Sequence, residues 1–457
     1  MESAHEHEGL RRIDAHRRDR VVRAAAAAGL VGERHVAAGF LDVDGVRRTV
    51  ADLHAAFGQD VPVLHTFAVK AAALVPVLRL VADAGMGCEV ASPGELALAR
   101  AAGVPADRIV LDSPAKTDAE LAEALGLGVA VNADNLQELD RTAALLAVRR
   151  SASVLGLRVN PQVGAGTIGA MSTASEHSKF GVPLRDPGAR ERVLDALDRY
   201  PWLTRLHVHV GSQGCWPDLI AAGVRATWEL AEEVNRRAGR RQVTSVDLGG
   251  GLPVNFDDDE VRPTHAEYAA HLRAAVPGLF GGDYSLVTEF GRSVVAKHGF
   301  TAARVEYTKE VGGRRIALTH AGAHLATRTV FMPDAWPLRV GVHHPDGTPR
   351  RGPEEVQDVA GPCCFAGDLV ARGRALPRIE PGDLVVLHDT GGYYTSAPWA
   401  YNSIARPAVH GFTTAGGQVR FATVRTEQTL AEIAAEAGGA HADTLTSLAR
   451  GGPGGER

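Results

Sequence analysis

Eight short apolar runs alternate with amphipathic helical stretches over roughly residues 60–295, and this alternation leaves the chain few possible folds. A short apolar run bounded by turn residues is typical of a buried strand, whereas apolar residues recurring every three or four positions are typical of a helix. Several helical stretches begin near Pro, Thr or Asn and end at Gly, as helix termini do. The eight runs are VLHTFAVK, MGCEVAS, RIVLDSP, VAVNAD, VLGLRVN, RLHVHVGS, TSVDLGGG and YSLVTEFGR.

Eight strand–helix units predict the α/β class, as a (β/α)8 TIM-like barrel whose inward-facing positions are filled by Val, Leu and Ile. A doubly wound open sheet is the alternative, because it alternates strands and helices in the same way. The helical stretch DVDGVRRTVADLHAAF precedes the first strand and is expected to be the first barrel helix.

A second domain is expected because the chain of 457 residues exceeds the roughly 250–300 over which one hydrophobic core usually grows. After about residue 300 the sequence is rich in strand-like segments and turns, with no long helical stretches between them. This pattern predicts a second, mostly β C-terminal domain. The expected division is 39–297 for the barrel, 1–38 with 298–437 for the β-rich domain, and 438–457 for a flexible tail.

Composition and charge exclude several classes of protein. The hydrophobic fraction of 45% and the charged fraction of 23% are ordinary for a globular protein. A net charge of −5 without a dense block of Lys and Arg argues against nucleic acid or an anionic membrane as the main partner. No segment resembles a signal peptide or a membrane span. The four cysteines lack the spacing of a disulfide framework or a zinc site, which predicts a cytoplasmic protein without a bound metal.

Lys70 lies where a strand-like run meets a helical one, in the segment HTFAVKAAA. Most lysines at strand ends are simply solvated, but a lysine that enters a pocket can lose solvent and form a Schiff base. In a (β/α)8 barrel the active site lies at the C-terminal ends of the strands, so other polar residues would surround Lys70 there. These strand ends carry Glu89, Asp134, Asn160, His209, Ser212, Gly249–Gly251 and Glu289–Arg292. The three successive glycines would let backbone N–H groups approach a phosphate, although a plain turn is the more common reading of such a run.

Seven motifs, taken in their order along the chain, resemble those of the fold-type III pyridoxal-phosphate decarboxylases. This family includes the diaminopimelate, ornithine and arginine decarboxylases and, more distantly, alanine racemase. The resemblance covers about residues 40–410, and each motif is weak alone. The motifs are FAVKA (67–71), EVASPGEL (89–96), HVGSQ (209–213), LGGGLP (248–253), EFGR (289–292), GPCCFAGD (361–368) and DTGGYYT (389–395).

The resemblance implies a barrel that binds pyridoxal 5′-phosphate, an electron sink for the carbanion left when CO2 departs from Cα. Lys70 would hold the cofactor, Glu289 would pair with its pyridine nitrogen, and His209 would stack on its ring. Glu89 would be the acidic residue beside the lysine. The cofactor's remaining contacts would come from Ser212, Gly249, Gly250, Gly251, Gly291, Arg292 and Tyr393.

The resemblance also implies a homodimer with the active site at the interface, completed by the β-rich domain. Cys364 would then reprotonate the carbanion in the partner's site, with Cys363 as the alternative one position away. Arg292 would bind either the phosphate or the substrate carboxylate. The substrate-binding residues would be Arg292, Arg328, Phe365 and Asp368.

Phe365 departs from the family pattern, because the diaminopimelate and ornithine enzymes have a carboxylate at this position that pairs with the distal amine. His320 likewise replaces the aspartate of an Asp-Ala-Gly segment. A buried phenyl ring cannot pair with an ammonium group. The sequence therefore predicts decarboxylation of an amino acid that is not a simple basic diamino acid.

Two other functions compete with decarboxylation. The first is an amino-acid racemase or epimerase on the same fold; Glu289 argues against it, because the alanine racemase branch has an arginine at the pyridine nitrogen. The second is a non-catalytic cofactor-binding regulatory homologue. Retention of Lys70, Glu289 and a cysteine at 363 or 364 argues against this second alternative.

Overall fold

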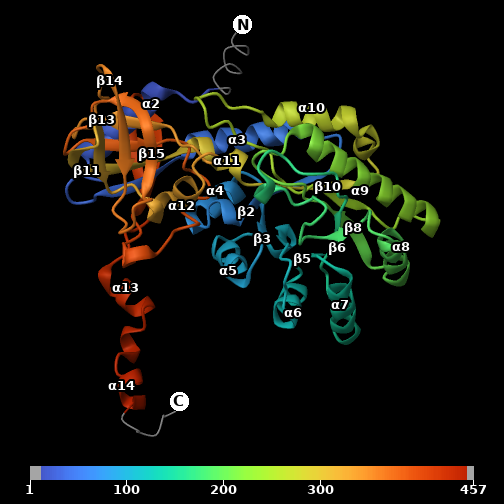
Figure 1. Ribbon diagram of the computed structural model, residues 1–457. Helices are drawn as coiled ribbons and strands as arrows, with labels where there is room; N and C mark the ends of the chain where they lie inside the picture. Colours follow the sequence, from blue (N-terminus) through green and yellow to red (C-terminus); the bar gives the residue numbers. More distant parts are fainter. Residues whose placement is uncertain (1–11, 450–457) are drawn as a thin grey trace.

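The computed structural model describes residues 12–449, in which a parallel barrel lies beside a β-rich domain (Figure 1). The barrel sheet is closed, because its outer strands β5 and β6 pair with each other, and every pairing in it is parallel. The predicted α/β class and eight-stranded barrel are therefore confirmed. Its strands are β2 (Val63–Ala68), β3 (Gly87–Val90), β4 (Ile109–Leu111), β5 (Ala130–Ala133), β6 (Leu155–Asn160), β8 (Leu203–His207), β9 (Ser245–Asp247) and β10 (Ser285–Phe290). The short β7 (Val182–Pro183) adds to β6.

The barrel helices begin and end where local sequence stabilises their termini. Thr117 and Glu120 form a capping box at the start of α6, and Gly128 follows its last turn at a φ of 80°. Ser92 and Asn135 cap α5 and α7 in the same way. The helices are α3 (Val43–Phe57), α4 (Val75–Asp83), α5 (Pro93–Ala101), α6 (Asp118–Leu127), α7 (Leu136–Val148), α8 (Ala189–Arg199), α9 (Pro217–Ala238), α10 (His265–Ala275) and α11 (Arg292–Val295).

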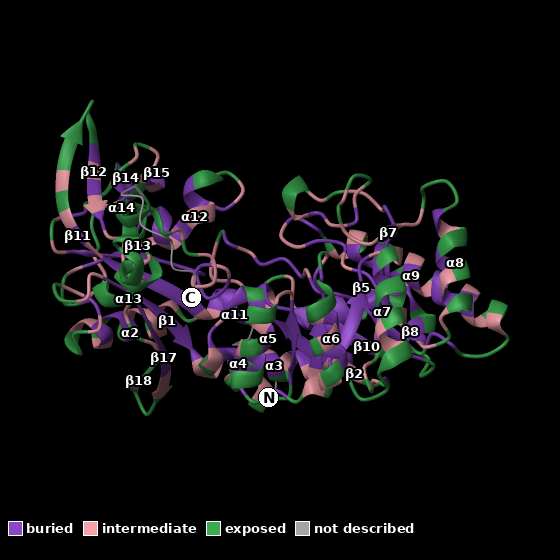
Figure 2. Ribbon diagram, turned by 90° about the horizontal axis from the view of Figure 1, so that it is seen from below, coloured by how far each residue is buried: buried purple, intermediate pink, exposed green. Residues whose placement is uncertain are grey.

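The interior of the barrel differs from the predicted filling by Val, Leu and Ile. The large apolar cluster lies between the strands and the surrounding helices, where Figure 2 shows buried inner and exposed outer helix faces. Inside the barrel, Val110, Ala130 and Val287 form only a small apolar cluster. Buried polar side chains occupy much of the rest, as in the hydrogen bond between Asn132 and Asp247 at 3.0 Å. Buried polar groups need such partners, so the interior is a polar network as well as a packed core.

The β-rich domain is built on one long sheet with the strand order β15-β14-β12-β11-β1-β17-β18. Strand β16 pairs with both β11 and β13. The strands are β1 (Ala37–Asp42), β11 (Gly299–Val311), β12 (Arg314–Thr319), β13 (Val340–His343), β14 (Glu354–Ala360), β15 (Leu369–Pro377), β16 (Leu384–Leu387), β17 (Ala408–Ala415) and β18 (Gln418–Arg425). Its helices are α2 (Ala15–Ala27) and α12 (Ala323–Phe331), followed along the chain by α13 (Leu430–Glu436) and α14 (Thr444–Ala449).

Two features differ from the expected domain division. Strand β1 pairs with β11 and β17 through residue 42, so the β-rich sheet crosses the expected boundary at 38/39. Residues 444–449, expected within a flexible tail, form α14, which extends away from the body with α13 (Figure 1). The GGPGGER segment itself lies outside the described residues.

Candidate active site

A cavity of about 350 Å³ lies at the C-terminal ends of the barrel strands. Because parallel strands in a barrel all end at one mouth, residues far apart in the sequence meet there. The cavity wall includes nine of the residues singled out in the sequence: Lys70, His209, Ser212, Gly251, Glu289, Gly291, Arg292, Arg328 and Tyr393.

Lys70 follows β2 in a single 3-10 turn (Val69–Ala71), and its side chain is 43% exposed toward this cavity. Its Nζ donates a hydrogen bond to Oε2 of Glu89, on β3, at 2.6 Å. Burial lowers the pKa of Lys70, but the Glu89 carboxylate, with smaller contributions from Tyr393 and Glu289, raises it above its usual value. For Glu89, burial raises the pKa and Lys70 opposes this. Lysine and glutamate therefore form a close ion pair at one end of the cavity.

His209 presents an uncharged imidazole to the cavity. The backbone N–H of Gly250 donates to its Nδ1 at 3.0 Å, so the ring proton resides on Nε2. Burial, reinforced by Arg158 and Lys70, holds the pKa of His209 well below its usual value. A flat neutral ring in this position can stack on a planar ligand.

Glu289, near the end of β10, is held between two histidines. Its Oε1 lies 3.6 Å from Nε2 of His207, and its Oε2 lies 4.0 Å from Nδ1 of His209. Oε1 is buried and has no hydrogen-bond partner within residues 12–449. Burial, together with Asp247 and Asp112, raises the pKa of Glu289 well above its usual range, and His207 opposes the rise. A buried carboxyl group with a strongly raised pKa is typical of a functional site.

Two arginines make part of the cavity wall cationic. The guanidinium carbon of Arg292 lies 4.3 Å from the ring centroid of Tyr393, and that of Arg328 lies 4.6 Å from it. Both arginines also stack on the buried Trp336. Burial lowers the pKa of Arg292 to about 10, and Arg328 adds to the lowering. Two guanidinium groups so close together favour an anionic ligand.

Only part of the predicted glycine cradle faces the cavity. The N–H of Gly249 donates to Asp247 and the N–H of Gly250 donates to His209, so neither amide is directed to a ligand. Gly251 does line the cavity. Gly249 and Gly251 have φ values of 64° and 97°, and a Cβ at Gly250 would overlap the backbone oxygen of Glu289. The glycines therefore serve mainly the left-handed turn and the close backbone approach.

Four predicted residues of the β-rich domain, Cys363, Cys364, Phe365 and Asp368, do not line this cavity. Cys364 is exposed, and its backbone N–H donates to Asn402 at 2.7 Å. Cys363 is buried, and burial raises its thiol pKa to about 11, with a further contribution from Asp368. The buried carboxylate of Asp368 accepts backbone N–H bonds from Ala323 and Cys363, and so supports the turn.

Phe365 lies in an aromatic cluster on the same domain. Its ring stacks on Phe331, with centroids 5.6 Å apart and planes 4° apart, and meets Trp399 edge-on at 5.4 Å. Tyr401 stacks on Trp399 at 4.6 Å. Phe331 and Tyr401 are exposed, so this aromatic cluster reaches the surface.

The sequence reasoning missed several cavity residues. Met171, Thr173, Lys179 and Phe180 come from the long segment between β6 and β7, which carries no periodic signal. It also missed Asp112 and His207. The sequence could have indicated both residues. Asp112 directly follows a strand, and His207 lies two residues before His209, on the same face of the chain.

The cavity fits pyridoxal phosphate. It combines an amine in Lys70, a flat neutral ring in His209, a carboxyl group in Glu289 and arginine side chains suited to a phosphate. Within residues 12–449, one group of side chains could also be considered for a metal ion, namely Asp112, His207 and Glu289. No described helix has both the length and the apolar character needed to cross a membrane.

Comparison with known proteins agrees with this geometry. Residues 43–296 match the family described as "Pyridoxal-dependent decarboxylase, pyridoxal binding domain". The chain is 36% identical over 349 residues to diaminopimelate decarboxylase of Deinococcus radiodurans, covering 75% of this chain and 82% of that enzyme. It is 34% identical over 355 residues to the enzyme of the same name from Pseudomonas aeruginosa, covering 76% and 80%. The crystal structure of diaminopimelate decarboxylase from Helicobacter pylori complexed with L-lysine shares the fold, with a TM-score of 0.77 at 23% identity, covering 88% of this chain and 97% of that one.

Proposed function

The chain belongs to the family of pyridoxal-dependent decarboxylases, amino-acid carboxy-lyases that use pyridoxal phosphate, and we propose that its substrate lacks a side-chain ammonium group. The bound cofactor supplies the electron sink for the pair left on Cα when CO2 departs. The protein's own residues must then bind, orient and transfer protons. We assign those roles from the contacts described above.

Lys70 would hold the cofactor through its amine and release it to the substrate. Its nitrogen must lose a proton before it can act as a nucleophile. Glu89 Oε2, 2.6 Å from Nζ, is positioned to accept that proton. Burial raises the pKa of Glu89, which makes it a stronger base than an exposed carboxylate.

Glu289 would face the pyridine nitrogen, and His209 would lie against the cofactor ring. A carboxylate beside the ring nitrogen favours its protonated form. The neutral His209 avoids placing a second positive charge against that ring. The phosphate would be held by residues that line the cavity near the two arginines, namely Ser212, Gly251, Gly291, Arg292 and Tyr393.

The substrate proposal depends on Phe365. Its ring belongs to the aromatic cluster of Phe331, Phe365, Trp399 and Tyr401, which offers no carboxylate to pair with a distal ammonium. Burying that charge without a partner would be unfavourable. Arg328 supplies a second guanidinium in the cavity, beyond the one proposed for the phosphate. An acidic or apolar α-amino acid fits this combination.

The active form is a homodimer in which the β-rich domain of one copy closes the barrel mouth of the other. The exposed Cys364 does not line the cavity of its own chain, which supports an action on the partner's site. In that arrangement Cys364 reprotonates Cα, and Phe365 beside it faces the substrate side chain. We also propose that the enzyme is cytoplasmic.

The test is CO2 release from a panel of D- and L-amino acids, measured on the holoenzyme and on Phe365→Asp. We expect faster turnover of acidic or apolar amino acids than of diaminopimelate, ornithine or lysine. Phe365→Asp should shift the ratio of kcat/KM values toward the diamino substrates by about tenfold or more, because it supplies the missing partner for the ammonium. Tyr307→Asp, at an exposed site of the same domain, is the control and should leave the ratio unchanged.

Diaminopimelate is the second candidate substrate, because relatives 34% and 36% identical to this chain carry that activity in their names. Diaminopimelate as the fastest substrate of the unaltered enzyme would overturn the substrate proposal and leave the decarboxylase assignment intact. Inversion of configuration without CO2 would instead indicate a racemase or epimerase. Cofactor binding without any reaction would indicate the regulatory alternative.

A further inference from the structure

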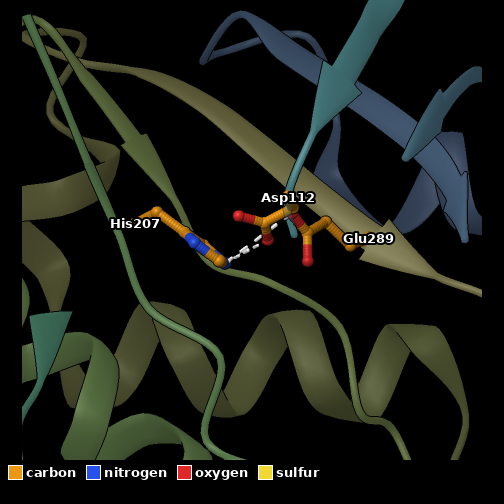
Figure 3. Close-up of side chains that lie close together, drawn as sticks. All are labelled: Asp112, His207 and Glu289. Atoms are coloured by element: carbon orange, nitrogen blue, oxygen red, sulfur yellow. Dashed lines mark ion pairs between the residues drawn. The ribbon is translucent and has the colours of Figure 1, made fainter. Parts of the chain in front are cut away.

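His207 occupies a position that the reaction as proposed does not use. It is the last residue of β8 and is fully buried, and the carboxyl groups of Asp112 and Glu289 both approach its Nε2 from the same side (Figure 3). Its Nε2 lies 3.3 Å from Oδ2 of Asp112 and 3.6 Å from Oε1 of Glu289. The ends of three barrel strands thus bring two acids to one nitrogen of a single imidazole.

The two oxygens of Glu289 have different neighbours. Oε1 lies toward His207, in the closed interior, whereas Oε2 lies toward His209, whose ring lines the cavity. An ion pair on Oε1 would therefore fix the rotation of the carboxyl group and leave Oε2 for a ligand. Asp112, which lies 3.3 Å from the same Nε2, fixes His207 in turn.

The charges around His207 favour its protonated form. The acids that act on it are Asp112, Glu289 and Asp247, and the nearby basic groups are Arg205, Arg158 and His209. Burial lowers the pKa of His207, but the three acids together raise it to about 10. For Glu289, burial and the other two acids raise the pKa, and His207 is the group that opposes them. A protonated His207 thus favours the carboxylate form of Glu289.

We propose that His207, fixed by Asp112, is a positioning residue that orients Glu289 and favours its ionised form toward the cofactor ring nitrogen. The inference rests on the function proposed for Glu289 and extends it to two residues that touch neither cofactor nor substrate. In this proposal Asp112, His207 and Glu289 form a chain of ion pairs and do not bind a metal ion. A metal ion would require the lone pair of a neutral His207, which the two flanking acids disfavour.

The first measurement uses the cofactor-free protein. With histidine labelled for NMR, the His207 signals should remain those of an imidazolium from pH 6 to about pH 9, and Asp112→Asn should lower the pKa of this ring. His207→Gln identifies the signals by their loss. A ring that titrates near its usual value in the unaltered protein would overturn the inference.

The second measurement uses the holoenzyme loaded with pyridoxal phosphate labelled with 15N in the ring. In His207→Gln the ring nitrogen signal should move toward that of an unprotonated pyridine, and the dissociation constant of the cofactor should rise about tenfold. Asp112→Asn should change the ring nitrogen signal and the dissociation constant in the same direction but by less. It replaces His207→Gln in this test if His207→Gln does not fold. The control is His343→Gln, because His343 is also buried and lies 3.2 Å from an acid, Asp19, outside the cavity.

Glu289→Gln separates this inference from the proposed function. If Glu289→Gln leaves the ring nitrogen signal unchanged, the role of Glu289 itself is wrong. If it moves the signal but His207→Gln and Asp112→Asn do not, only the positioning role is wrong. One equivalent of a divalent metal in the purified protein, with its removal reproducing the His207→Gln spectrum, would also overturn the inference.

Discussion

The barrel side of the cavity is built from paired charged groups, whereas the aromatic cluster of the β-rich domain is built from ring contacts. On the barrel side, Lys70, Glu89 and Glu289 lie within charge-pair distance of other ionisable groups on short, buried strands. In the aromatic cluster, Phe365 and its neighbours make ring contacts and reach the surface. The difference teaches that the charged groups of the cavity are fixed by rigid strand ends, whereas the aromatic cluster is an exposed surface, as the proposed homodimer requires.

The largest expected effect tests the barrel side. Lys70→Ala should abolish both CO2 release and the absorption band near about 420 nm that a lysine-bound cofactor produces. Lys309→Ala, at an exposed position of β11, is the control and should change neither. A band that survives in Lys70→Ala would show that the cofactor is not attached to this lysine.

The two adjacent cysteines offer a sharper comparison within the β-rich domain. Cys364→Ser should lower kcat by roughly 10²-fold or more, because a positioned proton donor typically contributes that much. Cofactor binding should remain. Cys363→Ser should instead act on stability, because its side chain packs in the apolar cluster of the domain. Steady-state kinetics and thermal unfolding of both variants distinguish the two roles, and the reverse result would shift the assignment by one residue.

The smallest expected effect compares how the two domains respond to acid. Burial lowers the pKa of His65 in the barrel to about 3 and that of His324 in the β-rich domain, with His320 adding to the shift, to about 4. The unfolded chain therefore binds these protons first, near pH 6.5, and the free energy of unfolding falls as the pH drops from there toward 4. Each histidine should contribute about 1.4 kcal/mol per pH unit.

Domain-resolved amide hydrogen exchange of the cofactor-free protein between pH 7 and 5 measures this effect. His65→Leu should reduce the loss of protection in the barrel alone, and His324→Leu should reduce it in the β-rich domain alone. An unchanged pH dependence in either variant would mean that the histidine is protonated in the folded protein.

Sequence patterns predict the strands and helices well because their signals are local. Thr117 and Glu120 are three residues apart and cap a helix wherever they occur before an apolar periodic stretch. The hydrogen bonds of Gly249 and Gly250 were not predictable in this way. Their N–H groups donate to Asp247 and His209, and this choice depends on the rotation of each peptide in a turn with positive φ.

Strand ends by themselves identify Lys70, His209 and Glu289 as candidates, because a strand that ends on a polar residue at a barrel mouth is visible in one dimension. The sequence also determines the (β/α)8 barrel, the change to a β-rich domain and the family to which the chain belongs. Only the tertiary structure decides that Asp112 and Glu289 both approach Nε2 of His207, that Cys364 lies away from its own cavity, and that Phe365 joins an aromatic cluster. The reason is physical: charge, burial and side-chain direction depend on which strands become neighbours when the barrel closes, and no local pattern records that distance.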